Sequence, residues 1–176
     1  MKLSASTTSW LDLFRSCRVS AVHLEMRDAY AVKNEVETLA AWRAGNDPSR
    51  TDPAYRRDWL DLVEETVSRG VEIRRARIVS EPVSEYIKYE HAGTQLNIDA
   101  GEQVRWLGRH RATGIALPAN DFWIYDGQLV EFNLFDGHGR KVGQELTEDP
   151  DVVRLCVGAF EAVWDRAVPH KEYEAR

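Results

Sequence analysis

Residues 71–107 read as a strand, a helix and a second strand, and this unit constrains the fold more than any other feature of the chain. Residues 71–79 (VEIRRARIV) and 103–107 (QVRWL) have strand character. The helical spacing between them is carried by Tyr86, Tyr89, Glu90, Gly93 and Leu96. We expect Ser80 to cap this helix, with Glu81 and Pro82 in its first turn. Strands joined by a helical crossover favour parallel pairing, so the unit predicts an α/β fold.

The N-terminal part adds a helix, a strand and two further helices. Residues 10–17 (WLDLFRSC) indicate a short amphipathic helix. Residues 21–27 alternate in polarity like a half-buried strand, which would leave His23 at the surface or at a sheet edge. Residues 33–44 predict a helix that ends at Gly45. The next helix is expected to begin with Asp52 as its cap and Pro53 in its first turn, and to end at Gly70. Its apolar stripe is Tyr55, Trp59, Leu62, Val63 and Val67.

The C-terminal part predicts a hairpin, a strand and a last helix. Residues 122–125 (FWIY) and 128–135 (QLVEFNLF) flank Asp126–Gly127, a strong two-residue turn signal. A strand is expected over roughly residues 140–146. The last helix should begin at Asp149–Pro150 and end at Pro169, followed by a frayed terminus. Its apolar stripe could also serve to pair two copies of the chain.

The 176 residues fit one domain, 1–176, with an ordered core over about 10–170. The predicted fold class is therefore a single α/β domain, with a mixed sheet flanked by helices on both faces. The expected core residues are Trp59, Ile78, Ile87, Trp106, Ile124, Phe160 and Trp164.

Composition narrows the classes of function. Twenty-nine acidic residues against 23 basic ones give a net charge of −6, which disfavours direct nucleic-acid binding. A basic stripe for DNA could be built only from Arg74, Arg75, Arg77, Arg105, Arg109 and Arg111. No stretch of the sequence approaches the ~20 apolar residues that span a bilayer, and no secretory signal is visible. We expect a cytoplasmic protein with no membrane association.

Familiar catalytic and metal-binding patterns are missing from the sequence. Cys17 and Cys156 lie in apolar patterns, as buried thiols do, and the five histidines show no ligand-like spacing. The glycine-rich stretch 137–143 (GHGRKVG) sits between two strands, so a hairpin turn explains it better than a phosphate loop. We therefore expect no metal, no cofactor and no catalytic residue.

An arginine run and an aromatic group mark the most plausible ligand site. Arg75 and Arg77 share one strand face, and Arg74 points to the other. They could protect an edge strand, pair with helix carboxylates, or face an anion. The aromatic group Tyr86, Tyr89, Trp106, Trp123 and Tyr125 could be core or pocket lining. Ligands of α/β sheets bind beyond the carboxyl ends of the strands. The candidate ligand residues are Arg75, Arg77, Ser80, Glu81, Tyr86, Tyr89, Asp121 and Trp123.

Several motifs together resemble a family of small actinobacterial proteins. They are Val-Ser-Glu-Pro at 79–82, Ala-Gly-Glu-x-x-Arg-Trp-Leu at 100–107, Asp-Phe-Trp at 121–123, and Trp-x-x-Ala-x-Pro-His at 164–170. Over roughly residues 10–173 the chain resembles domain of unknown function family 6879. The resemblance implies an association with helix-turn-helix regulators and supplies no catalytic residues.

A fainter resemblance is to one half of the phospholipase D-like fold. The motif of that fold is His-x-Lys, four residues, then Asp. With Asp126 as that aspartate, the histidine position falls on Ala119 and the lysine position on Asp121. Neither residue could do the chemistry. A partial match to this motif, His138-x-Arg140 followed by Glu145, lies in the glycine-rich hairpin.

Three functions follow as hypotheses. The first is a non-catalytic binding or regulatory module that recognises a small ligand or a helix-turn-helix regulator. The second is a phosphodiesterase-type hydrolase of phospholipase D-like ancestry. The third, DNA binding within a complex, is opposed by the net charge. Homodimer formation is also possible.

Overall fold

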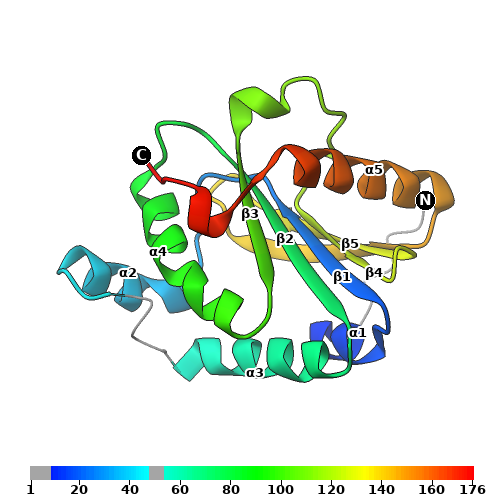
Figure 1. Ribbon diagram of the computed structural model, residues 1–176, viewed down its shortest axis with the longest axis horizontal. Helices are drawn as coiled ribbons and strands as arrows, with labels where there is room; N and C mark the ends of the chain where they lie inside the picture. Colours follow the sequence, from blue (N-terminus) through cyan, green and yellow to red (C-terminus); the bar gives the residue numbers. More distant parts are fainter. Residues whose placement is uncertain (1–8, 48–53) are drawn as a thin grey trace.

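Seven strands form one mixed sheet in the order β6-β5-β4-β1-β2-β3-β7 (Figure 1). The computed structural model describes residues 9–47 and 54–176. The strands are β1 (Ser20–Glu25), β2 (Glu72–Val79), β3 (Gln103–Gly108), β4 (Phe122–Tyr125), β5 (Leu129–Phe135), β6 (Lys141–Thr147) and β7 (Val168–Pro169). β1, β2 and β3 pair in parallel, and the remaining pairs are antiparallel. The predicted mixed sheet is confirmed.

Helices cover both faces of this sheet, as expected. They are α1 (Trp10–Ser16), α2 (Val36–Arg43), α3 (Ala54–Ser68), α4 (Glu85–Asp99) and α5 (Pro150–Arg166), with short 3-10 turns at Lys33–Glu35, Arg109–Ala112 and His170–Glu172. Figure 1 shows α5 on one side of the sheet and α1, α3 and α4 on the other. Within the described ranges, no helix is long and apolar enough to cross a membrane.

The alternation of side chains along the central strands builds a different layer on each face. Val22 and Leu24 of β1 pack with Phe160 and Val163 of α5. Ala21 of β1 faces the opposite way. It belongs to a second cluster with Phe14 of α1 and with Leu60 and Val63 of α3. The apolar stripe of α5 is thus buried against the sheet. Leu155, on the outer side of the helix, is 45% exposed. Six of the seven expected core residues are buried, while Trp59 is only partly buried.

The strand–helix–strand unit is confirmed, but its helix begins later than predicted. Ser84 is the cap, and its hydroxyl oxygen accepts a hydrogen bond from the backbone N–H of Ile87 at 3.1 Å. A proline disfavours helical backbone in the residue before it, so Pro82 keeps Glu81 out of the helix. Ser80 instead donates its hydroxyl to Asp28 at 2.6 Å.

The other predicted elements are largely confirmed. Asp126 and Gly127 both have positive φ values, 51° and 66°, and form the centre of the predicted turn between β4 and β5. The loop is one residue longer than the two-residue turn predicted, because Tyr125 pairs with Leu129. Asp149 caps α5, and its carboxylate accepts from the backbone N–H of Asp151 at 2.9 Å. The predicted cap at Asp52 and Pro53 lies outside the described residues, and so does the side chain of Tyr55.

The expectation of a frayed C-terminus is wrong. β7 pairs with the edge of β3, and the ring of Tyr173 stacks on Trp106 with centroids 5.6 Å apart. The backbone N–H of Val83 donates to the carbonyl of Arg176 at 2.7 Å. The segment after α5 therefore adds apolar and hydrogen-bonded contacts to the third core cluster, around Val79, Ile87 and Trp106.

Candidate functional site

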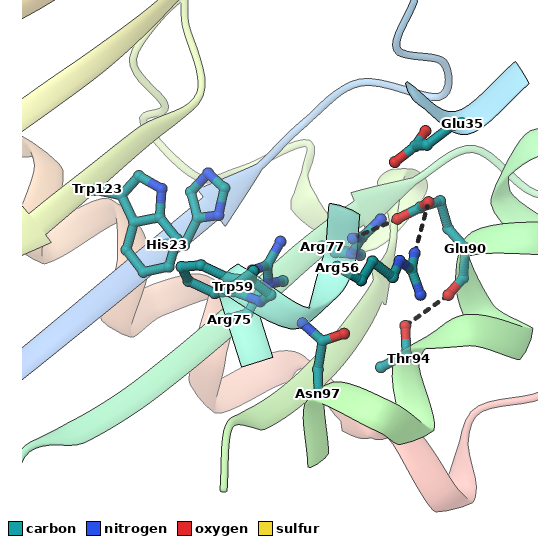
Figure 2. A pocket seen from close by; sticks show the side chains of 10 residues that line it. All are labelled: His23, Glu35, Arg56, Trp59, Arg75, Arg77, Glu90, Thr94, Asn97 and Trp123. Atoms are coloured by element: carbon teal, nitrogen blue, oxygen red, sulfur yellow. Dashed lines mark hydrogen bonds and ion pairs between the residues drawn. The ribbon is translucent and has the colours of Figure 1, made fainter. Parts of the chain in front are cut away.

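Two adjoining cavities open on the sheet face that α1, α3 and α4 cover. Their volumes are about 310 and 460 Å³. Both are lined by His23, Glu35, Trp59, Arg75, Arg77, Glu90 and Trp123, so we treat them as one groove (Figure 2). The volumes fall in the usual range for small-molecule sites. The groove is therefore the candidate functional site.

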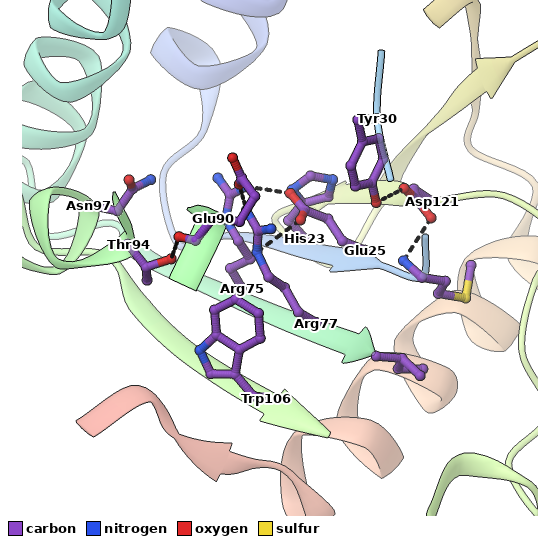
Figure 3. A network of polar contacts seen from close by, with 12 residues as sticks. His23, Glu25, Tyr30, Arg75, Arg77, Glu90, Thr94, Asn97, Trp106 and Asp121 are labelled. Carbon is purple, nitrogen blue, oxygen red and sulfur yellow. Dashed lines mark hydrogen bonds and ion pairs between the residues drawn. The ribbon is translucent and has the colours of Figure 1, made fainter. Parts of the chain in front are cut away.

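Buried ion pairs form the floor of the groove. Arg75 pairs with Glu25 of β1, and its Nε donates to Glu102 at 2.6 Å. Arg77 Nε lies 3.0 Å from Glu25, and its Nη2 donates to Glu90 of α4 at 2.8 Å (Figure 3). Buried charges of this kind are tolerable only when they are paired. Helix and strand carboxylates therefore hold both guanidinium groups in place.

These contacts decide between the alternatives for the arginine run. β2 lies between β1 and β3 in the sheet, so the edge-strand explanation is wrong. Pairing with helix carboxylates is confirmed: Arg77 pairs with Glu90, and Arg74 on the other face pairs with Glu161 of α5 at 2.8 Å. Arg74 and Arg75 thus point to opposite faces, so the run cannot form a continuous basic stripe.

His23 lies at the centre of the groove, and its predicted surface or edge position is wrong. It is 7% exposed, and its ring stacks on Trp123 with centroids 4.1 Å apart. Neither ring nitrogen makes a hydrogen bond to the described residues, although Nδ1 lies 3.3 Å from Glu25. Burial, together with the charges of Arg75 and Arg77, lowers the pKa of His23 well below 6.5, so the imidazole is neutral.

Two groove carboxylates, Glu35 and Asp121, are held by tyrosines. The hydroxyl of Tyr86 donates to Glu35 at 2.7 Å. The hydroxyl of Tyr30 donates to Asp121, which also accepts from the backbone N–H of Met26 at 2.9 Å. Burial and the charge of Glu90 raise the pKa of Glu35 to about 7. Burial and Glu25 raise the pKa of Asp121 to about 6. Both carboxyls thus titrate near neutral pH.

Aromatic side chains form much of the wall. They are Trp10, Phe14, Tyr30, Trp59, Tyr86, Trp123, Tyr125 and Phe135. Phe14 meets Trp59, Trp123 and Tyr125 edge to face, with centroids 5.0–5.4 Å apart. Trp10 stands at the rim and is 39% exposed. Flat walls around a charged floor suit a small ligand with a planar ring.

The structure brings five of the eight candidate ligand residues to this groove and leaves three outside its lining. Arg75, Arg77, Tyr86, Asp121 and Trp123 line it. Ser80 and Glu81 instead contact neighbouring loops: Ser80 binds Asp28 and Arg109, and Glu81 accepts from the hydroxyl of Tyr173 at 2.9 Å. Tyr89 is buried next to Tyr86 and does not line the groove. Its hydroxyl lies 2.6 Å from that of Thr38.

The family model for Domain of unknown function (DUF6879) matches residues 8–175, nearly the whole chain. The protein belongs to this family. No curated protein matches its sequence.

Among solved structures, the DUF6879 fold is similar to that of Nuc, a phospholipase D family member from Salmonella typhimurium. The TM-score is 0.53 at 11% identity, over 90% of this chain and 86% of Nuc. A weaker match, with a TM-score of 0.47 at 17% identity, is to TrmBL2, an archaeal chromatin protein, over 89% of this chain and 47% of that one. The likeness to Nuc confirms a phospholipase D-like fold.

Other reactive groups of the DUF6879 domain lie away from the groove. Burial raises the pKa of both Cys17 and Cys156 to about 11, so neither is a thiolate at neutral pH. His138 is exposed in the turn between β5 and β6, and Arg140 there pairs with Asp136 at 2.7 Å. Within residues 9–47 and 54–176, no three potential metal-ligating side chains converge.

Sequence reasoning missed most of the polar residues of the groove, among them His23, Glu25, Glu35 and Glu90. A partial signal existed, because His23 and Glu25 occupy one face of an apolar strand, as Arg75 and Arg77 do. In the parallel pairing of β1 and β2, His23 lies opposite Arg75 and Glu25 opposite Arg77. Matching polar faces on two central strands could thus have indicated a shared buried polar layer.

Proposed function

We propose that this DUF6879 domain is a non-catalytic module that binds a small ligand in the groove over β1 and β2. The observation that carries this proposal is that the cations lining the groove are already paired with carboxylates. Arg75, Arg77, Arg56 and Lys141 each lie within 4.0 Å of a carboxylate, so they serve the architecture of the floor. A phosphoryl-transfer site instead needs positive charge left over for the phosphate.

The aromatic walls and the partly unpartnered floor support ligand binding over a purely structural role. Neither ring nitrogen of His23 forms a hydrogen bond with the described residues, and neither does Nη1 of Arg77. Buried polar atoms normally find partners, because leaving one without a partner costs about 1–3 kcal/mol. A ligand in the groove would supply them.

A regulatory setting is part of the proposal. Ligand binding would alter the packing of α4 and of the 26–35 segment, both of which contribute residues to the groove. A helix-turn-helix regulator in the cytoplasm is the partner that we propose for reading this change. Support for that partner comes from the family resemblance of the motifs at 79–82, 100–107 and 164–170. Co-purification with such a regulator, with and without ligand, tests it.

A phosphodiesterase is the second candidate, and one observation favours it. A neutral imidazole, His23, lies beside the cationic Arg75 and Arg77 in a groove of a phospholipase D-like fold. Phosphoryl transfer can use a neutral histidine as nucleophile. Against it, Asp121 occupies the lysine position of the motif and lines the same groove, where its charge repels phosphate.

Two measurements separate these candidates. A thermal-shift screen with aromatic amines, amides, carboxylates and phosphate esters should give at least one stabilising compound, and this shift should be lost in Trp59→Ala. Hydrolysis of bis(p-nitrophenyl) phosphate should be undetectable. Turnover that disappears in His23→Gln but persists in His138→Gln, which changes an exposed histidine, would establish the phosphodiesterase. The absence of any stabilising compound would contradict the binding module.

A further inference from the structure

Glu35 and Asp121 hold the excess negative charge of the groove. The groove lining contains five carboxylates, Glu25, Glu35, Glu90, Asp121 and Glu131, and four cations, Arg56, Arg75, Arg77 and Lys141. Glu102 adds a further carboxylate against Arg75. Among the described residues, no cation lies within 4.0 Å of Glu35 or Asp121, and tyrosine hydroxyls donate to each of them. Arg56 and Arg77 act on Glu35, and Arg27 acts on Asp121, only at longer range. The charge that the groove lacks is therefore positive.

The two carboxyls lie on either side of a pair of tyrosines. The rings of Tyr30 and Tyr86 are 6.2 Å apart between centroids, and each donates its hydroxyl to one of the acids. Figure 3 shows the hydroxyl of Tyr30 directed at Asp121. Tyr30 also contacts Phe135, with centroids 5.5 Å apart. Carboxylates bordered by aromatic rings form the environment that organic cations prefer in proteins.

Independent evidence for a ligand comes from buried acceptors that no donor among residues 9–47 and 54–176 satisfies. The side-chain oxygen of Asn133, which lines the groove, makes no hydrogen bond to the described residues, and that residue is 7% exposed. A neutral imidazole has one acceptor nitrogen, and both nitrogens of His23 are without hydrogen bonds within the described ranges. Asn133 and the acceptor nitrogen of His23 therefore call for N–H or O–H donors on the ligand, while the N–H of His23 and Nη1 of Arg77 call for an acceptor beside them.

The rim suits a flat molecule that enters from solvent. Trp10 and Val32 line the larger cavity and are 39% and 41% exposed. Trp59 and Trp123 stand deeper, with ring centroids 5.8 Å apart. The guanidinium of Arg75 already lies 5.7 Å from the centre of each of these two rings, so both indoles accept a planar cation on their faces.

We propose that the groove binds a flat organic cation, an amidinium or a protonated amine attached to an aromatic ring, whose charge is balanced by Glu35 and Asp121. This inference rests on the proposed function and names the chemical class of its ligand. The cationic group supplies the missing positive charge and donates hydrogen bonds to the unpartnered acceptors, while the ring packs against the aromatic walls. Anions of the same shape are excluded by Glu35 and Asp121.

Three probes of nearly equal shape test the charge preference. Benzamidine, benzamide and benzoate are titrated at pH 8 into the ¹⁵N-labelled full chain, and the indole N–H signals are followed. These signals are assigned with Trp59→Phe and Trp123→Phe. Benzamidine should shift the Trp59 and Trp123 signals, benzamide should bind more weakly, and benzoate should leave them unchanged. Glu35→Gln and Asp121→Asn should each weaken benzamidine binding about tenfold, the size of one charge-assisted hydrogen bond.

Glu37→Gln is the matched control, because it removes an exposed carboxylate two residues from Glu35 and outside the groove lining. It should leave benzamidine affinity unchanged. Benzoate binding as tightly as benzamidine, or benzamidine affinity unaffected by both groove variants, would overturn the inference. If none of the three probes binds, the cation inference fails. The proposed function then stands only if the broader thermal-shift screen finds an uncharged or anionic ligand, and it falls if that screen is also empty.

Discussion

His23 and Trp123 face each other across β1 and β4 and stack with their ring planes 16° from parallel. The stack fixes the imidazole over the floor of the groove. Burial and the nearby Arg75 and Arg77 keep it neutral. Its two nitrogens are desolvated and form no hydrogen bond with the part of the chain that the structure describes. Burying these polar atoms without hydrogen bonds lowers the stability of the ligand-free protein, and a ligand in the groove could contact them.

Replacing His23 by phenylalanine should stabilise the protein. Phenylalanine preserves the stack and removes both unpartnered nitrogens, so we expect a gain of about 1 kcal/mol at pH 7. The folded pKa of His23 is depressed, so its contribution to stability is lost as pH falls below about 6.5, where the unfolded histidine takes up a proton. The advantage of the variant should grow between pH 7 and pH 5. Urea unfolding of the wild type, His23→Phe and the exposed-site control His138→Phe measures this. An unstable variant at pH 7 would contradict it.

Arg77→Met should be strongly destabilising. It leaves Glu25 and Glu90 in a buried layer without the guanidinium that now contacts both. Removing one partner of a buried ion pair costs about 3–5 kcal/mol. Adding Glu90→Gln should recover part of this loss, because one buried negative charge is then gone. Chemical denaturation of the single and double variants gives the coupling. Arg154→Met serves as the control, since it breaks an exposed pair with Asp151 and should change stability little.

Glu35→Gln should stabilise the ligand-free protein at alkaline pH. The raised pKa, about 7, means that the folded state disfavours the ionised carboxylate. Glu35 therefore destabilises the fold progressively as pH rises from about 4.5 to about 7, and fully above that range. The groups that set this balance are Glu90 and Tyr86 of α4, Arg56 of α3 and Arg77 of β2.

We expect Glu35→Gln to gain about 1–2 kcal/mol at pH 8 and almost nothing at pH 4.5. Unfolding free energies at the two pH values, with Glu37→Gln alongside, measure the difference. An equal effect at both pH values would show that Glu35 does not titrate near neutral pH. Because the variant should be more stable than the wild type, weaker benzamidine binding could not be attributed to unfolding.

Asp126→Asn should loosen the connection between α1 and β1. The Asp126 carboxylate accepts hydrogen bonds from the backbone N–H groups of Arg18, Val19 and Ser20, at 2.7–3.1 Å. Asparagine tolerates the φ of 51° but has one carbonyl oxygen in place of the carboxylate, so about 1–2 kcal/mol should be lost. Unfolding curves together with amide exchange at Val19 and Ser20 check this. Exchange rates equal to those of the wild type would refute the assignment.

Local patterns predicted most elements of the fold. The three-and-four spacing of Val153, Cys156, Phe160 and Val163 predicted α5, and Asp126–Gly127 predicted the hairpin between β4 and β5. Errors arose where two local signals competed. Ser80 and Ser84 both precede acidic residues, and the effect of Pro82 on Glu81 decided for Ser84.

The groove was harder to predict than the fold. Asp121, Trp123 and the paired faces of Arg75 and Arg77 were identified from strand positions. Tyr30 could not be, because it lies in a segment without regular polarity. Glu35 was placed at the start of the predicted helix 33–44, and it reaches the groove only through tertiary folding. His23 was misplaced because an alternating strand was assumed to face solvent with its polar side, whereas helices cover both faces here.

The pairing of β1 with β2 also guards against misfolding. In the native alignment Glu25 lies opposite Arg77, and the polar sides of both strands face the groove. A slip of β2 by one residue would turn Arg75 and Arg77 toward Phe160 and Leu24, in the apolar layer beneath α5. Glu25, Glu90 and Glu102 would then be left in the groove without Arg75 and Arg77, so their unpaired charge would disfavour an alignment that apolar packing alone could tolerate.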